Sequence, residues 1–155
     1  MGEEHPGTLT SMNNLAITYR DQGRLLEATD LNEKVLKARR RTLGEEHPDT
    51  LMSMGNLAAT YWDQERLKDA VALQESVMKT QIKTFGGEYP DTLRIMNNLA
   101  YTYKSLGRAT EAISLMQRSV EGSRKVLGEE HPDTIRRTNK LRKLREWSLL
   151  DSDTP

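Results

Sequence analysis

The stretch Gly44-Glu45-Glu46-His47-Pro48 occurs three times in this chain and decides how the sequence is organised. Identical copies begin at Gly2 and Gly128, and the variant Gly-Gly-Glu-Tyr-Pro begins at Gly86. The four copies therefore stand at regular intervals of 42 residues. A fixed period of this length indicates a stack of equivalent structural repeats, which we place at about 6–47, 48–89 and 90–131.

Each repeat is predicted to contain two antiparallel helices. The first helix starts at a proline, because the first helical position needs no N–H donor, and an aspartate follows in all but the first repeat. These prolines are Pro6, Pro48, Pro90 and Pro132. The first helices are expected to end near Gln22, Gln64 and Leu106. Gly23 and Gly107 then supply a turn with positive φ, where Glu65 shows that glycine is not obligatory.

Apolar residues in both helices recur at spacings of three and four, which is the pattern of a helix with one buried face. In the first repeat they are Met12, Leu15, Ala16 and Tyr19, followed by Leu25, Ala28, Leu31 and Val35. One helix pair cannot cover its own apolar face, so the repeats must stack. The predicted fold is all-α, a solenoid of stacked antiparallel helix pairs with seven helices.

The seventh helix is expected at 133–150, as a solvating cap with no partner helix of its own. Its Ile135, Leu141 and Leu144, with Trp147 or Leu150, are expected to face the preceding helix. We predict one domain over 1–150 and a disordered tail over 151–155.

Composition disfavours several classes of function. The 23 basic and 23 acidic residues balance, which argues against general binding of nucleic acid, and the absence of cysteine excludes disulfides and thiolate metal sites. The sequence contains no apolar run of membrane-spanning length, and its start lacks the features of a signal peptide. We expect a soluble cytoplasmic protein.

Neither a metal site nor an enzyme is predicted. His5, His47 and His131 occur once per repeat, so they should lie far apart, whereas metal ligands must converge. A role in capping or packing at the helix start suits them better. The acidic pairs beside them repeat in the same way, and no motif for phosphate binding or nucleophilic catalysis occurs. We expect no cofactor.

The pattern Leu15-Ala16-x-x-Tyr19, followed by Gly23-Arg24-x-x-Glu27-Ala28, resembles the tetratricopeptide repeat. The 42-residue spacing with its Leu-Gly-x-x-His-Pro-Asp-Thr linker is most similar to the long repeats of kinesin light chain. The resemblance covers residues 2 to about 150. It implies a right-handed superhelix whose concave groove binds peptides or proteins without catalysis, and in kinesin light chain the peptides are acidic and contain tryptophan.

The resemblance also implies where a ligand would lie. In this family an asparagine of each first helix often hydrogen-bonds the backbone of a bound peptide, and the matching residues here are Asn14, Asn56 and Asn98. These asparagines could instead bond to a neighbouring helix and hold the stack together. Neighbouring positions that vary between repeats complete the candidate peptide-binding set: Asn13, Arg20, Trp62, Arg94, Asn97, Tyr101 and Lys104. We call the series Asn14, Asn56 and Asn98, with one asparagine per repeat, the asparagine ladder. It is expected to end at the next equivalent position, which is Lys140.

The sequence is compatible with three functions. The leading one is a non-catalytic scaffold that binds a peptide or protein, which is acidic if the basic candidates contact it. The second is self-association through exposed ends of the solenoid, where Met12, Leu15 and Ile17 are expected to be partly bare. The third, disfavoured by the neutral charge balance, is RNA binding by a helical repeat.

Overall fold

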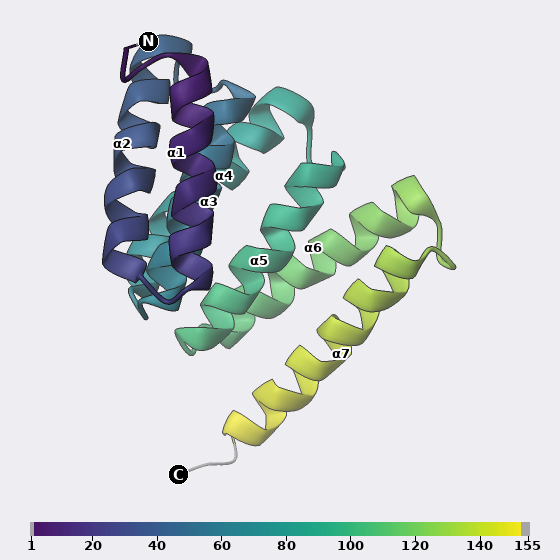
Figure 1. Ribbon diagram of the computed structural model, residues 1–155. Coiled ribbons are helices and arrows are strands. Elements are labelled where there is room, and N and C mark those ends of the chain that lie inside the picture. Colours follow the sequence, from purple (N-terminus) through teal and green to yellow (C-terminus); the bar gives the residue numbers. More distant parts are fainter. Residues whose placement is uncertain (1, 153–155) are drawn as a thin grey trace. The chain divides into compact units, whose positions relative to one another are not determined.

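The computed structural model describes residues 2–152, which form seven α-helices and no strand (Figure 1). The predicted all-α fold and its helix count are therefore confirmed for these residues. The helices are α1 (Pro6–Asp21), α2 (Leu25–Leu43), α3 (Pro48–Asp63), α4 (Leu67–Phe85), α5 (Pro90–Ser105), α6 (Ala109–Leu127) and α7 (Pro132–Ser152).

The first helix of each repeat begins at its proline, as predicted, and three of the four are capped by a histidine. Nδ1 of His5 accepts a hydrogen bond from the backbone N–H of residue 7, at 3.0 Å. His47 and His131 each accept from the second residue after them, at 3.1 Å. Tyr89 makes no side-chain cap and stacks instead on Phe85, with ring centroids 4.8 Å apart. The predicted capping or packing role of these positions is confirmed.

The turn after each first helix uses positive φ, whatever residue occupies it. Gly23 and Gly107 have φ of 75° and 74°, and Glu65 at the equivalent place has φ of 60°. A side chain with a Cβ is strained in this region, so Glu65 adopts the backbone that the turn imposes. The repeat architecture overrides local preference at this residue.

The chain divides into two compact units, the first reaching Val77 and the second beginning at Met78. The division falls inside α4. In the first unit α1 packs on α2, and α2 packs on α3. Leu9, Val35 and Ala38 form a buried cluster between α1 and α2, with Met12 against it. Met12 and Val35 of the predicted apolar faces therefore meet in this pair, together with Leu9 and Ala38, which the prediction did not include.

Two buried polar pairs join α2 to α3 beside the apolar contacts. Nη1 of Arg39 donates to Oγ of Ser53 at 2.8 Å, and Asn32 donates to the hydroxyl of Thr60 at 3.1 Å. Arg39 is only 4% exposed, so its guanidinium depends on neutral acceptors, the hydroxyl of Ser53 and the backbone carbonyl oxygen of Asp49 at 3.2 Å.

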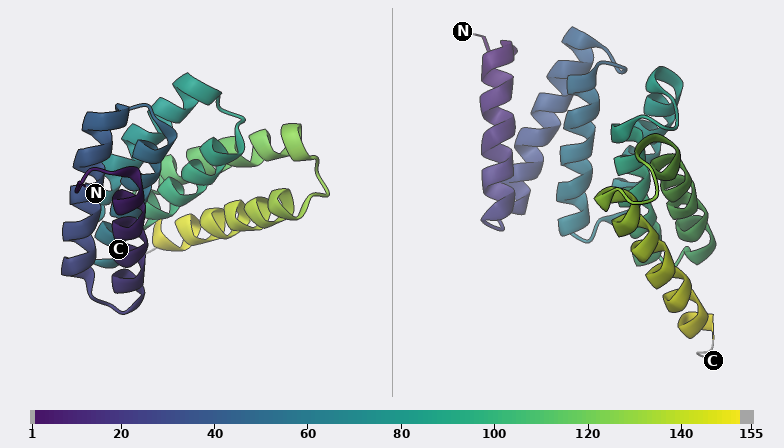
Figure 2. Two further views of the ribbon diagram at one scale, coloured as in Figure 1. Left: turned by 45° about the horizontal axis from the view of Figure 1, so that its top comes forward. Right: turned by 90° about the vertical axis from the view of Figure 1, so that its right-hand side faces the viewer.

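In the second unit α5 packs on α6, and α6 packs on α7, which runs alongside it (Figure 2). A similar bond joins α6 to α7. In the 42-residue repeat, Ser123 stands at the position of Arg39, and Arg137 stands at the position of Ser53. Here Nη1 of Arg137 on α7 donates to Oγ of Ser123 on α6. The same arginine–serine bond is thus made from either side of the contact.

The last helix confirms part of the prediction and corrects part of it. Leu141 and Leu144 are buried, as expected, at 6% and 2% exposed. The expectation that Ile135 is covered was wrong, since it is 48% exposed. Of the two alternatives Trp147 and Leu150, Leu150 is 74% exposed and Trp147 is partly buried. Ile135 stands where Leu9 stands in the first repeat, and that position packs on the second helix of its own repeat. No such helix accompanies α7 among the described residues.

Helix α7 also extends beyond its predicted end at residue 150. It continues to Ser152, two residues into the segment predicted as a tail, and residues 153–155 lie outside the described part of the chain. The prediction of one domain over 1–150 stays a prediction.

Candidate peptide-binding surface

The first helices of successive repeats lie next to each other within each unit, and we call the surface they form the first-helix face. In the first unit it consists of α1 and α3, and in the second unit of α5 and α7. The predicted site residues all lie on these four helices or their ends. Each unit is described separately.

In the first unit an asparagine pair crosses from α3 to α1. Nδ2 of Asn56 donates to Oδ1 of Asn13 at 2.7 Å, and Asn13 is only 6% exposed. Asn14, the first member of the predicted ladder, is exposed. Asn56 therefore uses one of its donors to join the two helices, as in the alternative weighed for the asparagines.

An ion pair crosses between the same helices about two turns further along. Nε of Arg20 on α1 contacts a carboxylate oxygen of Asp63 on α3. Both side chains are partly exposed, so the pair is screened by water and holds the helix ends together only weakly. Trp62, beside Asp63 in the sequence, is 44% exposed and keeps a large aromatic surface open to solvent.

In the second unit, cations of one helix lie over aromatic rings of the other. Nζ of Lys140 on α7 is 5.2 Å from the ring centroid of Tyr101 on α5. In the reverse sense, Nζ of Lys104 on α5 is 5.5 Å from the ring centroid of Trp147 on α7. Such contacts stabilise by about 0.5–1 kcal/mol when exposed, and each ammonium keeps N–H donors free for an anionic group.

The electrostatics of this surface reflect its partial burial. The pKa of Lys140 is lowered, mainly by burial and also by the neighbouring charges of Arg136 and Arg137. Burial raises the pKa of Tyr101. Lys140 thus lies among like charges of α7, and an acidic ligand on this part of the first-helix face would relieve their repulsion.

The remaining candidates on α5 differ in exposure. Asn98 is exposed, whereas Oδ1 of Asn97 is buried and has no hydrogen-bond partner in the part of the chain that the structure describes. Arg94 is largely exposed and pairs with Asp91 at 3.5 Å. Asn98 and Arg94 are therefore the α5 candidates most open to a ligand.

Sequence reasoning missed two members of this surface. Lys140 was predicted to end the ladder, and Trp147 was assigned only to packing, yet both meet predicted site residues of α5. The alignment of the repeats does place Lys140 at the position of Asn14, Asn56 and Asn98. No sequence signal pairs Trp147 with Lys104.

Two negative findings apply to the described residues. None of their helices combines the length and apolar character that crossing a membrane requires. They also hold no group of three or more histidine, cysteine, aspartate or glutamate residues arranged to bind a metal ion.

Comparison with known proteins agrees with this geometry. The tetratricopeptide repeat family matches at residues 7–83 and again at 92–133. Repeats of a Podosopora anserina protein described as a kinesin light chain, solved as a crystal structure of nearly identical TPR-like repeats, share 33% identity with a TM-score of 0.83. The alignment covers 96% of this chain and 71% of that one.

The chain is a tetratricopeptide repeat protein of the kinesin light chain type. A single-substitution variant of the Podosopora repeats matches at 31% identity and a TM-score of 0.83, over 97% of this chain and 71% of that one. BtubC (BKLC) from P. vanneervenii has the same fold, with a TM-score of 0.77 at 19% identity, over 92% of this chain and 58% of that one. No curated protein matches.

Membership of this family confirms the predicted class of fold, an α-solenoid of helix pairs. Tetratricopeptide repeats generally mediate protein–protein interaction, and their fold is typically a non-catalytic scaffold. This tetratricopeptide repeat protein is therefore expected to act through a protein partner.

Proposed function

We propose that this protein is a non-catalytic scaffold that binds an acidic peptide or protein segment along its first-helix face, the concave side of the superhelix in this family. The arrangement of α5 and α7 carries the proposal. Tyr101 and Lys104 of α5 and Lys140 and Trp147 of α7 bring cations and aromatic rings to one surface, which suits a ligand with carboxylates and an aromatic side chain. Asn98 stands exposed beside them.

The proposal assigns backbone contacts with the peptide mainly to Asn14 and Asn98 of the asparagine ladder, and fewer to Asn56. Asn14 and Asn98 are exposed and can both donate to and accept from a peptide backbone. Asn56 offers its remaining hydrogen-bonding capacity, because one donor is bonded to Asn13. Trp62 supplies a possible aromatic anchor in the first unit, where Arg20 is already paired with Asp63.

The proposal is tested with a fluorescein-labelled peptide that contains one tryptophan flanked by aspartates and glutamates. We expect Lys104→Glu to weaken binding about tenfold and Asn98→Ala to weaken it about fivefold. Arg118→Glu is the matched control, because Arg118 is an exposed cation on α6, outside the first-helix face.

Fluorescence polarisation measures the affinities, and circular dichroism verifies that each variant stays folded. Equal weakening by Lys104→Glu and Arg118→Glu would mean that only net charge matters. That result, or no binding by the unaltered chain, contradicts the proposal.

Self-association is the second candidate, because apolar side chains of α1 are open to solvent. Leu15 is 42% exposed, whereas Leu57 at the equivalent place on α3 is 3% exposed, and Ile17 is 39% exposed. Burial of these side chains by a second copy would stabilise a dimer. Light scattering over a concentration series tests this, and a mass that stays monomeric at every concentration eliminates it.

We propose the cytoplasm as the compartment, on the resemblance to kinesin light chain. Microscopy of the tagged protein in its native cell tests this, and a signal confined to a membrane-bounded compartment contradicts it.

A further inference from the structure

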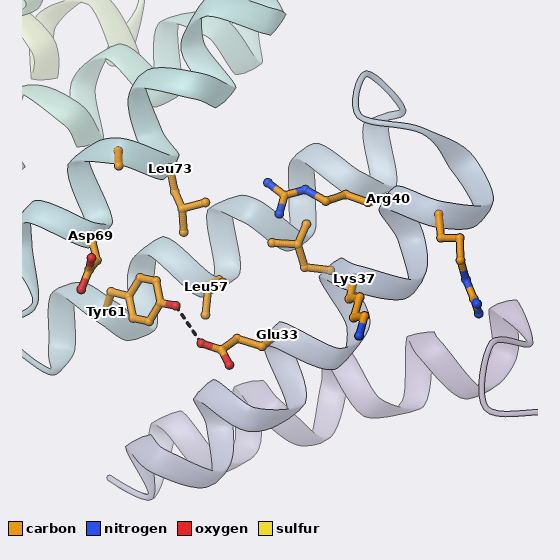
Figure 3. A pocket seen from close by; sticks show the side chains of 10 residues that line it. Glu33, Lys37, Arg40, Leu57, Tyr61, Asp69 and Leu73 are labelled. Atoms are coloured by element: carbon orange, nitrogen blue, oxygen red, sulfur yellow. Dashed lines mark hydrogen bonds between the residues drawn. The ribbon is translucent and has the colours of Figure 1, made fainter.

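A groove opens on another side of the first unit, over α3 and between the second helices α2 and α4 (Figure 3). Its volume is about 800 Å³, within the range that ligand sites occupy. Apolar side chains line its middle, one from each helix: Leu36, Leu57 and Leu73. We call this the second-helix groove.

The second-helix groove is separate from the first-helix face, although both use α3. Leu57 and Tyr61, which line the groove, are four residues apart and share one side of the helix. Asn56 and Trp62, which belong to the first-helix face, each lie about 100–140° around the helix from these two residues, given its 3.6 residues per turn. A ligand in the groove therefore leaves the first-helix face free.

One end of the second-helix groove is cationic, since Lys37, Arg40 and Arg41 of α2 line it. Lys37 has no ion-pair partner among residues 2–152. Arg40 pairs with Glu45 at 3.0 Å, and Arg41 pairs with Glu4. The glutamates lie in linkers, and exposed pairs of this kind contribute only about 0–1 kcal/mol, so a ligand's carboxylates can replace them.

The other end has the opposite net charge, because the carboxylates of Glu33 and Asp69 outnumber the guanidinium of Arg66, which pairs with Asp69 at 2.9 Å. The hydroxyl of Tyr61 donates to Oε1 of Glu33 at 2.8 Å across the end of the groove, and Asp69 lies beside them (Figure 3). Burial and the bond to Glu33 raise the pKa of Tyr61, so it stays a donor. The two ends together fix the direction in which a charged ligand can lie.

The length of the groove limits the size of its occupant. Its α2 lining runs from Glu33 to Arg41, which is about two helical turns or 12 Å. The apolar floor in the middle, where Leu36 and Leu57 are 4% and 3% exposed and Leu73 is more open, matches the one apolar stripe of a short amphipathic helix, the mode in which many grooves between helices bind peptides.

We propose that the second-helix groove binds a second protein segment, a short amphipathic helix with two or three apolar side chains and carboxylates at one end. The apolar side chains pack on Leu36, Leu57 and Leu73, and the carboxylates meet Lys37 and Arg40. The scaffold thereby holds two different segments at once, one on each face.

The test uses a labelled probe peptide without tryptophan, with leucines at positions i and i+4 and four glutamates at one end. We expect Lys37→Glu with Arg40→Glu to weaken its binding about tenfold. The matched control is Lys34→Glu with Lys68→Glu, which makes the same change in net charge at exposed lysines of α2 and α4 that do not line the groove. It should change the affinity less than about twofold.

Amide chemical shifts of the ¹⁵N-labelled chain locate the bound probe, and Lys104→Glu separates the two proposals, since it should weaken only the tryptophan peptide. Shifts centred on Leu36, Leu57 and Leu73 support the second-helix groove. Shifts centred on the first-helix face, equal weakening by both double variants, or no binding at about 1 mM probe overturn it. Octanoate binding in the groove without peptide binding also overturns it and makes this a site for a small amphiphilic acid.

Discussion

Replacing Asn56 by alanine removes the amide that donates to Asn13, and the structure gives the size of the effect. The bond is 2.7 Å long, and its acceptor belongs to a residue that is 6% exposed, so water cannot readily replace the lost donor. A buried acceptor left unsatisfied costs about 1–3 kcal/mol. Alanine returns about 0.5 kcal/mol through its better helix propensity. We expect a net loss of about 1–2 kcal/mol.

Urea unfolding followed by circular dichroism measures this loss in Asn56→Ala, in Asn13→Ala and in the double variant. The double-mutant cycle should give a coupling free energy of about 1 kcal/mol, because each single change breaks the same bond. Asn14→Ala is the matched control, since Asn14 is exposed on the same helix as Asn13, and its unfolding free energy should change by less than about 0.5 kcal/mol.

A coupling free energy within about 0.3 kcal/mol of zero would refute the reasoning, because it would mean that the two side chains do not depend on each other. The same experiment separates two roles for the ladder. Asn98→Ala should leave unfolding nearly unchanged and weaken the tryptophan peptide, whereas Asn56→Ala should affect unfolding first.

Four further changes test the fold and its electrostatics. His47→Ala should lower the unfolding free energy by about 1 kcal/mol in urea by removing a helix cap, while His47→Asn keeps a capping acceptor and most of the stability. Glu65→Gly should raise the unfolding free energy by about 0.5–1 kcal/mol, because glycine tolerates φ of 60°; an unchanged midpoint counts against strain there. Arg39→Ser should cost about 1–3 kcal/mol, and adding Ser53→Arg should recover part of that loss by recreating the exchanged pair of the last two helices. The pKa of Lys140 is lowered in the folded chain, so between that lowered pKa and 10.5 the unfolded chain binds more protons and stability rises with pH; Lys140→Met should remove that rise in urea titrations, and an identical pH profile would exclude the effect.

Several features could be predicted from the sequence because they depend on local chemistry. The helix starts at Pro6, Pro48, Pro90 and Pro132 and the ends near Gln22, Gln64 and Leu106 agree with the structure, because they depend on residues that are adjacent in the chain. Because the sequence repeats every 42 residues, helix bounds that were correct in one repeat were also correct at the equivalent positions of the others. It even identified Glu65 as a turn residue without glycine.

The candidate site was less predictable, because it depends on side chains that meet across helices. Asn56 and Asn98 are equivalent in sequence, yet Asn56 is bonded to Asn13 and Asn98 is exposed. Lys140 and Trp147 gained their partners from the packing of α7, a helix predicted only as a cap.

The sequence by itself determined the repeat, the helices and the turns, because each of these follows from chemistry within a few neighbouring residues. Tertiary structure decided which carboxamides bond to each other, that Ile135 lies exposed, and that Leu36, Leu57 and Leu73 line one groove. Those outcomes depend on rotamers and on the register between helices that are tens of residues apart. A repeating sequence specifies equivalent positions, but the neighbours that each copy meets differ along the stack.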